Sequence, residues 1–157
     1  MKSAIEIADY ILRKADSVSD TITPMQILKL VYLCHGWMLG LYGRQLIKED
    51  IEAWRYGPVI RDLYDAVKDY RSQAITKFLL AQEVSLDPAE KNIVDQVYEK
   101  YGQYSGPALS RLTHMTGSPW DITYTLLGQS KAISNDLIED YFKQQAQASQ
   151  EAGPGGN

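Results

Sequence analysis

The chain has 157 residues, enough for one domain whose core buries roughly two-thirds of the surface of the unfolded chain. Its formal net charge is −4, which excludes a bulk attraction to nucleic acid or anionic lipid, and no run of basic residues offsets that charge. A disulfide within the chain is excluded because Cys34 is its one cysteine, and a cytoplasmic location is the natural inference.

A capping box of Ser3 and Glu6 predicts a first helix near the N-terminus. One side of this helix is apolar at helical spacing: Ile5, Ala8, Ile11, Leu12 and Ala15. The other side is polar: Glu6, Asp9, Arg13 and Lys14. The two sides predict an amphipathic helix, followed by a loop at residues 16–20.

The stretch 24–42 is predicted to form the central helix of the fold. Thr23 is its N-cap, Pro24 suits the first helical position, Gln26 completes a capping box, and Gly43 fits the left-handed residue that closes it. Its residues are apolar around most of the circumference, which indicates burial. Its length of roughly 28 Å also approaches that of a membrane span, but Gln26, Lys29 and His35 favour a buried helix.

The next segment has no helical period. Leu46 and Ile47, then residues 51–54, predict a small β-hairpin-like element near 45–56 with a turn at 48–50. Gly57 and Pro58 are predicted to form a sharp corner at which a third helix starts. Residues 71–86 fit either a second hairpin or a short helix followed by an extended piece.

Further helix starts follow downstream. Asp87 and Glu90 form another capping box, and Ser105 precedes a Gly-Pro helix start. Residues 120–127 suit another turn or two of helix, and Ser134 or Asn135 can cap a last helix. The predicted fold is mainly α, a compact bundle of about six to seven helices around the buried central helix. Residues 1–143 are expected to form a single domain, and the polar, Gly-rich residues 144–157 a disordered tail.

The sequence contains no recognisable catalytic constellation. His35 lies among apolar neighbours, which predicts a hydrogen-bonded core histidine, and His114 lies near a helix C-terminus, where a cation is favoured. Cys34 and His35 point about 100° apart on a helix and cannot converge on a metal ion. We therefore expect no catalytic residues, no metal site, no cofactor and no enzymatic activity.

Three stretches stand out from this helical background: LKLVYLCHGW at 28–37, IEAWRYGPVIRDLY at 51–64 and LSRLTHMTGSPWD at 109–121. In this order and spacing they resemble the Panacea domain, a phage-associated family with GepA-like and SocA-like members. The resemblance covers roughly residues 5–127. It depends on these positions: Leu28-Lys29-Leu30 with Tyr32 and Trp37, Glu52-Ala53-Trp54 with Tyr56-Gly57-Pro58-Val59, and Leu112-Thr113-His114 with Pro119-Trp120.

The resemblance implies an antitoxin that neutralises its cognate toxin by binding it directly. Panacea proteins are typically encoded beside a toxin gene in bacteria and their phages, so the expected partner is the product of the adjacent gene. Two alternatives stay open, an adaptor that delivers the bound toxin to a protease and an enzyme that reverses a toxin's modification. A DNA-binding regulator is the weakest alternative, because the net charge opposes it. No membrane or nucleic-acid partner is expected, while surface aromatic residues leave a homo-oligomer open.

Candidate partner-binding residues come from the three motifs: Lys29, Trp54, Arg55, Tyr56 and His114. Lys29 either has a structural role, snorkelling or pairing with a carboxylate such as Glu52, or contacts the toxin. Trp54 is expected to be a core anchor rather than a contact. Arg55 and Tyr56, two residue types common at interface hot spots, are expected at the surface. Four further motif residues are assigned structural roles: Trp37, Gly57, Pro58 and Trp120.

Overall fold

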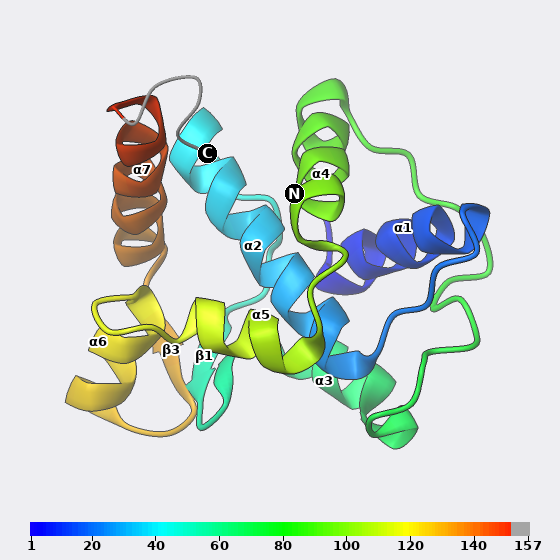
Figure 1. Cartoon of the computed structure of the whole chain (residues 1–157), viewed down its shortest axis with the longest axis horizontal. Coiled ribbons are helices and arrows are strands. Elements are labelled where there is room, and N and C mark those ends of the chain that lie inside the picture. Colours follow the sequence, from blue (N-terminus) through cyan, green and yellow to red (C-terminus); the bar gives the residue numbers. More distant parts are fainter. Residues whose placement is uncertain (152–157) are drawn as a thin grey trace.

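The computed structural model describes residues 1–151, and its centre is the helix α2 (Pro24–Tyr42). Thr23 and Gln26 form the predicted capping box, and Gly43, at φ 66° and ψ 25°, closes the helix in the left-handed conformation. The side chains around α2 are buried on nearly all sides, among them Leu30, Val31 and Met38. In Figure 1, α2 runs diagonally through the middle of the molecule.

The other helices pack around α2, which confirms the predicted mainly α bundle. They are α1 (Ala4–Ser17), α3 (Arg61–Val67) with a 3-10 turn at Lys68–Tyr70, α4 (Pro88–Tyr101), α5 (Gly106–Thr113), α6 (Pro119–Leu127) and α7 (Asn135–Glu151). Helix α7 lies on one side of α2 and α4 on the other, while α5 crosses its N-terminal half (Figure 1). No helix among residues 1–151 is long and apolar enough to cross a bilayer.

A small antiparallel sheet confirms the β-element predicted near 45–56, including its strand at residues 51–54, but corrects the partner strand and the turn. Its strands are β1 (Ile51–Trp54), β2 (Gly57–Val59) and β3 (Lys131–Ile133), in the order β2-β1-β3. The hairpin therefore turns at residues 55–56 rather than at 48–50, and Ile47 forms only an isolated bridge to Lys2. The third strand, which pairs Ile133 with Ile51, was not predicted.

The prediction that Gly57 and Pro58 start a helix was also wrong. Both residues lie in β2, and α3 begins at Arg61. A proline is tolerated in an edge strand because its missing N–H removes no ladder bond there, and β2 is an edge strand. Gly57 adopts φ 120°, a conformation that suits glycine alone.

Helix α7 packs against the strip of α2 that carries Gly36 and Gly40. A Cβ atom at Gly36 would overlap the Phe142 ring, and one at Gly40 would lie 2.7 Å from Phe142 Cβ. The small residues thus let a neighbouring helix of the same chain approach closely. Helix α7 continues to Glu151, so residues 144–151, predicted as part of a disordered tail, are helical, and residues 152–157 lie outside the described residues.

The long segment 71–86 forms neither of the predicted alternatives, because α1 holds it in an irregular path. Asp9, placed by the sequence on the polar side of α1, is buried and accepts bonds from the N–H groups of Leu79 and Leu80, at 2.9 and 3.1 Å. Arg13 pairs with Asp9 at 2.7 Å and donates to the Leu80 carbonyl. One buried carboxylate therefore replaces the backbone pairing that a hairpin would supply.

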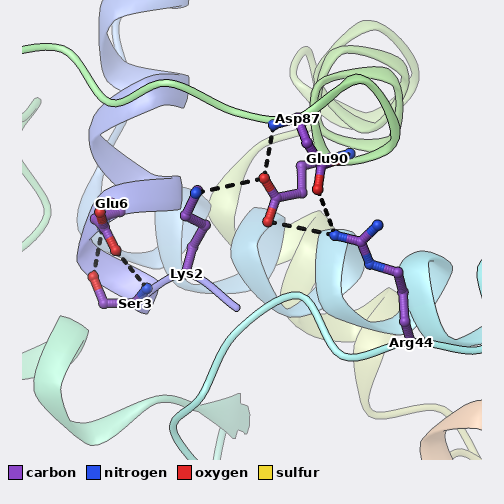
Figure 2. A network of polar contacts seen from close by, with 6 residues as sticks. All are labelled: Lys2, Ser3, Glu6, Arg44, Asp87 and Glu90. Carbon is purple, nitrogen blue, oxygen red and sulfur yellow. Dashed lines mark hydrogen bonds and ion pairs between the residues drawn. The ribbon is translucent and has the colours of Figure 1, made fainter.

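A network of charged side chains joins three segments that are distant in the sequence, near residues 2, 44 and 87–90 (Figure 2). Glu90, buried at the start of α4, completes a capping box with Asp87 and lies 3.7 Å from both Lys2 Nζ and Arg44 Nη2. Arg44 also pairs with Asp87 at 2.7 Å. A buried carboxylate needs such partners. Here the partners hold the start of α4 against the segment just before α1 and the segment just after α2.

Candidate partner-binding site

The turn of the β1–β2 hairpin displays Arg55 and Tyr56 at the surface, as the sequence predicted. Tyr56 is 61% exposed, and the Arg55 guanidinium lies over its ring at 5.4 Å from the centroid. Arginine and tyrosine combine large contact area with directional hydrogen bonds. The corner can therefore contact a protein partner through both types of interaction.

Two helices hold this hairpin turn in place through its backbone carbonyl groups. The indole Nε1 of Trp120, in α6, donates to the carbonyl of Trp54 at 2.5 Å. The hydroxyl of Ser110, in α5, donates to the carbonyl of Tyr56, also at 2.5 Å. Because the bonds involve the backbone, the Arg55 and Tyr56 side chains stay available to a partner.

His114 lies behind the hairpin turn rather than on its outer face. Its Nδ1 is 3.4 Å from the Ser110 hydroxyl, and its ring packs on Trp120 with centroids 5.1 Å apart. The imidazole therefore supports the two residues that grip the hairpin. His114 therefore contacts two residues that hold the hairpin, Ser110 and Trp120, and does not line the groove described below.

Lys29 lies beneath the same corner and is almost fully buried, at 2% exposure. Its Nζ donates to the carbonyl of Pro58 at 2.9 Å. A Cβ atom on Gly57 would lie 3.1 Å from Lys29 Nζ and Cε, so the glycine leaves the space that the ammonium group occupies. Burial lowers the pKa of Lys29 to about 7.

The carboxylate suggested as the partner of Lys29 is engaged elsewhere. Glu52 accepts from the Trp54 indole and from Arg61, both at 2.9 Å. Trp54 is half-buried, packs edge-on against Tyr64 at 4.9 Å and lies under the Arg61 guanidinium. Trp54 is thus an anchor of the hairpin with one face near the surface. Lys29 does not reach solvent, and it forms no ion pair with the side chains of residues 1–150.

A groove of about 520 Å³ runs along the corner between the hairpin, the start of α2 and the end of α3. It is lined by four of the five predicted binding residues (Lys29, Trp54, Arg55 and Tyr56), while His114 is not among its lining residues. The fold adds Lys68, Arg71 and Gln129, which the sequence did not suggest. They lie in segments without a motif, so only their spatial position points to them.

The remaining candidates for chemistry have structural roles. His35 is buried, with its Nδ1 accepting from the N–H of Ile47 at 3.3 Å and its Nε2 2.9 Å from Asn135 Oδ1. Burial lowers the pKa of His35 and raises that of Cys34. Trp37 packs on Phe142 at 5.1 Å. Among the side chains of residues 1–150, no group of three or more His, Cys, Asp or Glu could hold a metal ion.

The fold and the site together define a small, mainly helical domain that displays a braced hairpin corner beside a groove. A family model described as "Antitoxin SocA-like, Panacea domain" matches residues 27–121. This is more than half of the chain, which therefore belongs to that family, as its three motifs suggested. All three motifs, and the whole of the hairpin, lie inside the matched region.

A relative of known function covers most of the chain. Antitoxin SocA of Caulobacter vibrioides (strain NA1000 / CB15N) is 29% identical over 151 residues, a match that spans 87% of this chain and 80% of that protein. No solved structure matches the chain.

Proposed function

We propose that this protein is the antitoxin of a toxin–antitoxin system and neutralises its cognate toxin by binding it directly. Family membership and the similarity to antitoxin SocA support the antitoxin role. The toxin is expected to be encoded by the adjacent gene. Neutralisation is expected to be non-enzymatic and to require one antitoxin for each toxin bound.

The braced hairpin corner is the observation that supports direct binding best. Arg55 and Tyr56 are exposed, while the carbonyl groups of Trp54 and Tyr56 are fixed by α6 and α5. A rigid element presenting an arginine and a tyrosine loses little conformational entropy on binding, which favours affinity. Exposed apolar residues on the adjacent α6, Ile122 and Leu126, lie one helical turn apart and extend the contact surface.

The test is a double substitution at this corner, Arg55→Glu with Tyr56→Ala. The product of the adjacent gene should arrest growth when expressed alone, and co-expression of the wild-type chain should restore growth. The double variant should bind that toxin at least about 30-fold more weakly, because losing a hot spot costs about 2 kcal/mol. It should also fail to restore growth. Calorimetric titration measures the affinity.

A matched control substitutes the same kinds of residue far from the corner, Lys48→Glu with Tyr42→Ala. Both are exposed, and Tyr42 lies about 20 Å from the start of the groove along α2. Both double variants should keep the wild-type circular dichroism spectrum. An adjacent product that is harmless alone, or that stays toxic with the wild-type chain present, contradicts the antitoxin proposal. Equal toxin affinity in both double variants contradicts the corner as its binding site.

A further inference from the structure

The corner groove differs in charge from the rest of this acidic chain. Four of its lining residues are basic, namely Lys29, Arg55, Lys68 and Arg71, and none of the described residues that line it is acidic. Lys68 pairs with Asp65 at 3.5 Å, whereas Arg55 and Arg71 form no ion pair with the side chains of residues 1–150. In a chain of net charge −4, a groove lined by four basic residues and no acidic one favours an anionic ligand over a cationic one.

The groove also has an apolar floor. Apolar or aromatic side chains line it between the cations: Met25, Leu28, Trp54, Val59 and Tyr64. Such a surface can bury an aromatic or aliphatic side chain of a partner, and a volume of about 520 Å³ can hold a short peptide segment rather than a whole helix bundle.

Lys29 adds a buried donor at the base of this groove. An ammonium group has three N–H donors, and within residues 1–151 the bond to the Pro58 carbonyl is the one that Nζ makes. Burying a cation with so few partners is costly. A carboxylate that entered the groove would supply both the missing acceptor and the missing counter-charge.

Arg71 is held in a strained backbone conformation on the rim. The N–H of Gln73 bonds to the carbonyl of Tyr70 at 2.9 Å and closes a turn in which Arg71 has φ 57° and ψ −115°. These angles belong to the first central position of a type II′ turn, which glycine normally occupies. An arginine at a glycine position is a feature that stability alone does not explain, and such strain is concentrated at ligand clamps.

We propose that the corner groove binds an acidic segment of the partner that carries one aromatic or aliphatic anchor. The anchor packs on the apolar floor, and the flanking carboxylates meet the rim arginines Arg55 and Arg71 and the buried Lys29. This inference rests on the proposed function in taking that partner to be the toxin. The rim of free cations, the unmatched donor at the base and the strained arginine all point to the same anionic ligand.

The test uses defined peptides, which makes it independent of any toxin. Three capped, fluorescein-labelled ten-residue peptides are titrated by anisotropy: Glu/Asp residues around a central Trp, the same acidic peptide with Ala for Trp, and Lys/Arg residues around a central Trp. The acidic Trp peptide should bind at least tenfold more tightly than either of the others. Raising the salt concentration from 50 to 300 mM should weaken the binding of this acidic Trp peptide about tenfold, because several charges make the contact.

The variant Arg71→Gly separates a binding role from a structural one. Relief of the strained turn should raise the Tm by about 2 to 4 °C, while the affinity for the acidic Trp peptide should fall about tenfold. Ser19→Gly is the matched control, because Ser19 also has a positive φ, 58°, in the loop before α2. It should raise the Tm similarly and leave peptide affinity unchanged.

Three results would overturn the inference: no binding of the acidic Trp peptide up to about 1 mM, equal binding of the acidic and basic peptides, or unchanged affinity in Arg71→Gly. If the wild-type chain neutralises its toxin and the Arg71→Gly variant binds that toxin with full affinity, this inference is overturned and the proposed function stands. A chain that binds the acidic peptide but neutralises no toxin would overturn the proposed function and leave the groove's ligand class intact.

Discussion

At the scale of single residues, Lys29 is the side chain whose chemistry matters most. The sequence leaves its role open between toxin contact and a structural role with Glu52 as the suggested partner, and in the structure it bonds to the Pro58 carbonyl instead of Glu52. The motif could identify Lys29 as unusual, because a charge in the middle of a buried helix needs an explanation. It could not supply the partner, since that partner is a backbone carbonyl of a strand whose position depends on the whole fold.

Burial of Lys29 makes the stability of the free protein depend on pH. Its folded pKa of about 7 is below the ordinary value of 10.5, so between these values the unfolded chain binds a proton that the folded chain does not. Stability should therefore rise as the pH increases from about 7. Tyr98 opposes this trend above about pH 10, because its pKa is raised to about 12 in the folded protein.

Replacing Lys29 with methionine should stabilise the free protein. Lys29→Met removes the cost of burying the amine and keeps an unbranched chain of similar length, so at pH 7 it should raise the free energy of unfolding by about 1 to 4 kcal/mol. The rise of stability from pH 7 to 9.5 should also disappear. Urea unfolding at several pH values measures both effects. A less stable variant with the wild-type pH dependence would contradict the role given to burial.

At the scale of elements, the packing of α7 on α2 depends on one aromatic ring. Phe142 is buried against Gly36 and Gly40 and contacts Tyr32 and Trp37 edge-on, with ring centroids 5.9 and 5.1 Å apart. The glycines on the narrow strip of α2 are explained by this contact. A neighbouring helix of the same chain therefore fills the space that the two glycines leave.

The variant Gly36→Ala should destabilise the protein although alanine is the better helix former. The new Cβ overlaps the Phe142 ring, and overpacking of this kind costs about 1 to 3 kcal/mol. In a Phe142→Ala background the overlap is removed, so the same substitution should stabilise by up to about 1 kcal/mol through helix propensity. Chemical denaturation of the four proteins of this cycle measures the change of sign, and additive effects would contradict the contact.

The helices of this chain could be predicted because their signals are local. Ser3 with Glu6, Thr23 with Gln26 and Asp87 with Glu90 all form the expected capping boxes within four residues of sequence. The strand at residues 51–54 was predicted, but its pairing could not be, since one partner, β3, lies some 80 residues away in the chain. The irregular segment 71–86 was missed for a similar reason, because it depends on the buried Asp9 of α1.

At the scale of the whole molecule, the candidate site combines a predicted corner with an unpredicted groove. Arg55 and Tyr56 could be expected at the surface from their motif, whereas Lys68 and Arg71 reach the same groove only through the fold. Cations collected from separate segments form no run in the sequence. The acidic net charge argues against a bulk attraction to nucleic acid or anionic lipid, and it gives no sign of the four basic residues that line this groove.

At this scale, the three candidate functions (direct inhibitor, adaptor and enzyme) differ in the stoichiometry of neutralisation and in the fate of the toxin. A direct inhibitor is consumed one-to-one and leaves the toxin intact. An adaptor also binds but shortens the toxin's half-life when a protease is present. An enzyme that reverses a modification acts below one-to-one. These differences can be measured without knowing which surface is used.

The most direct test of the central claim is a titration of purified toxin, the product of the adjacent gene, with this protein and no protease present. Toxin activity should fall linearly and reach zero at one antitoxin per toxin, and toxin separated from the complex and refolded should regain full activity. Neutralisation far below one-to-one, or undiminished toxin activity at equimolar protein, would contradict neutralisation by direct binding.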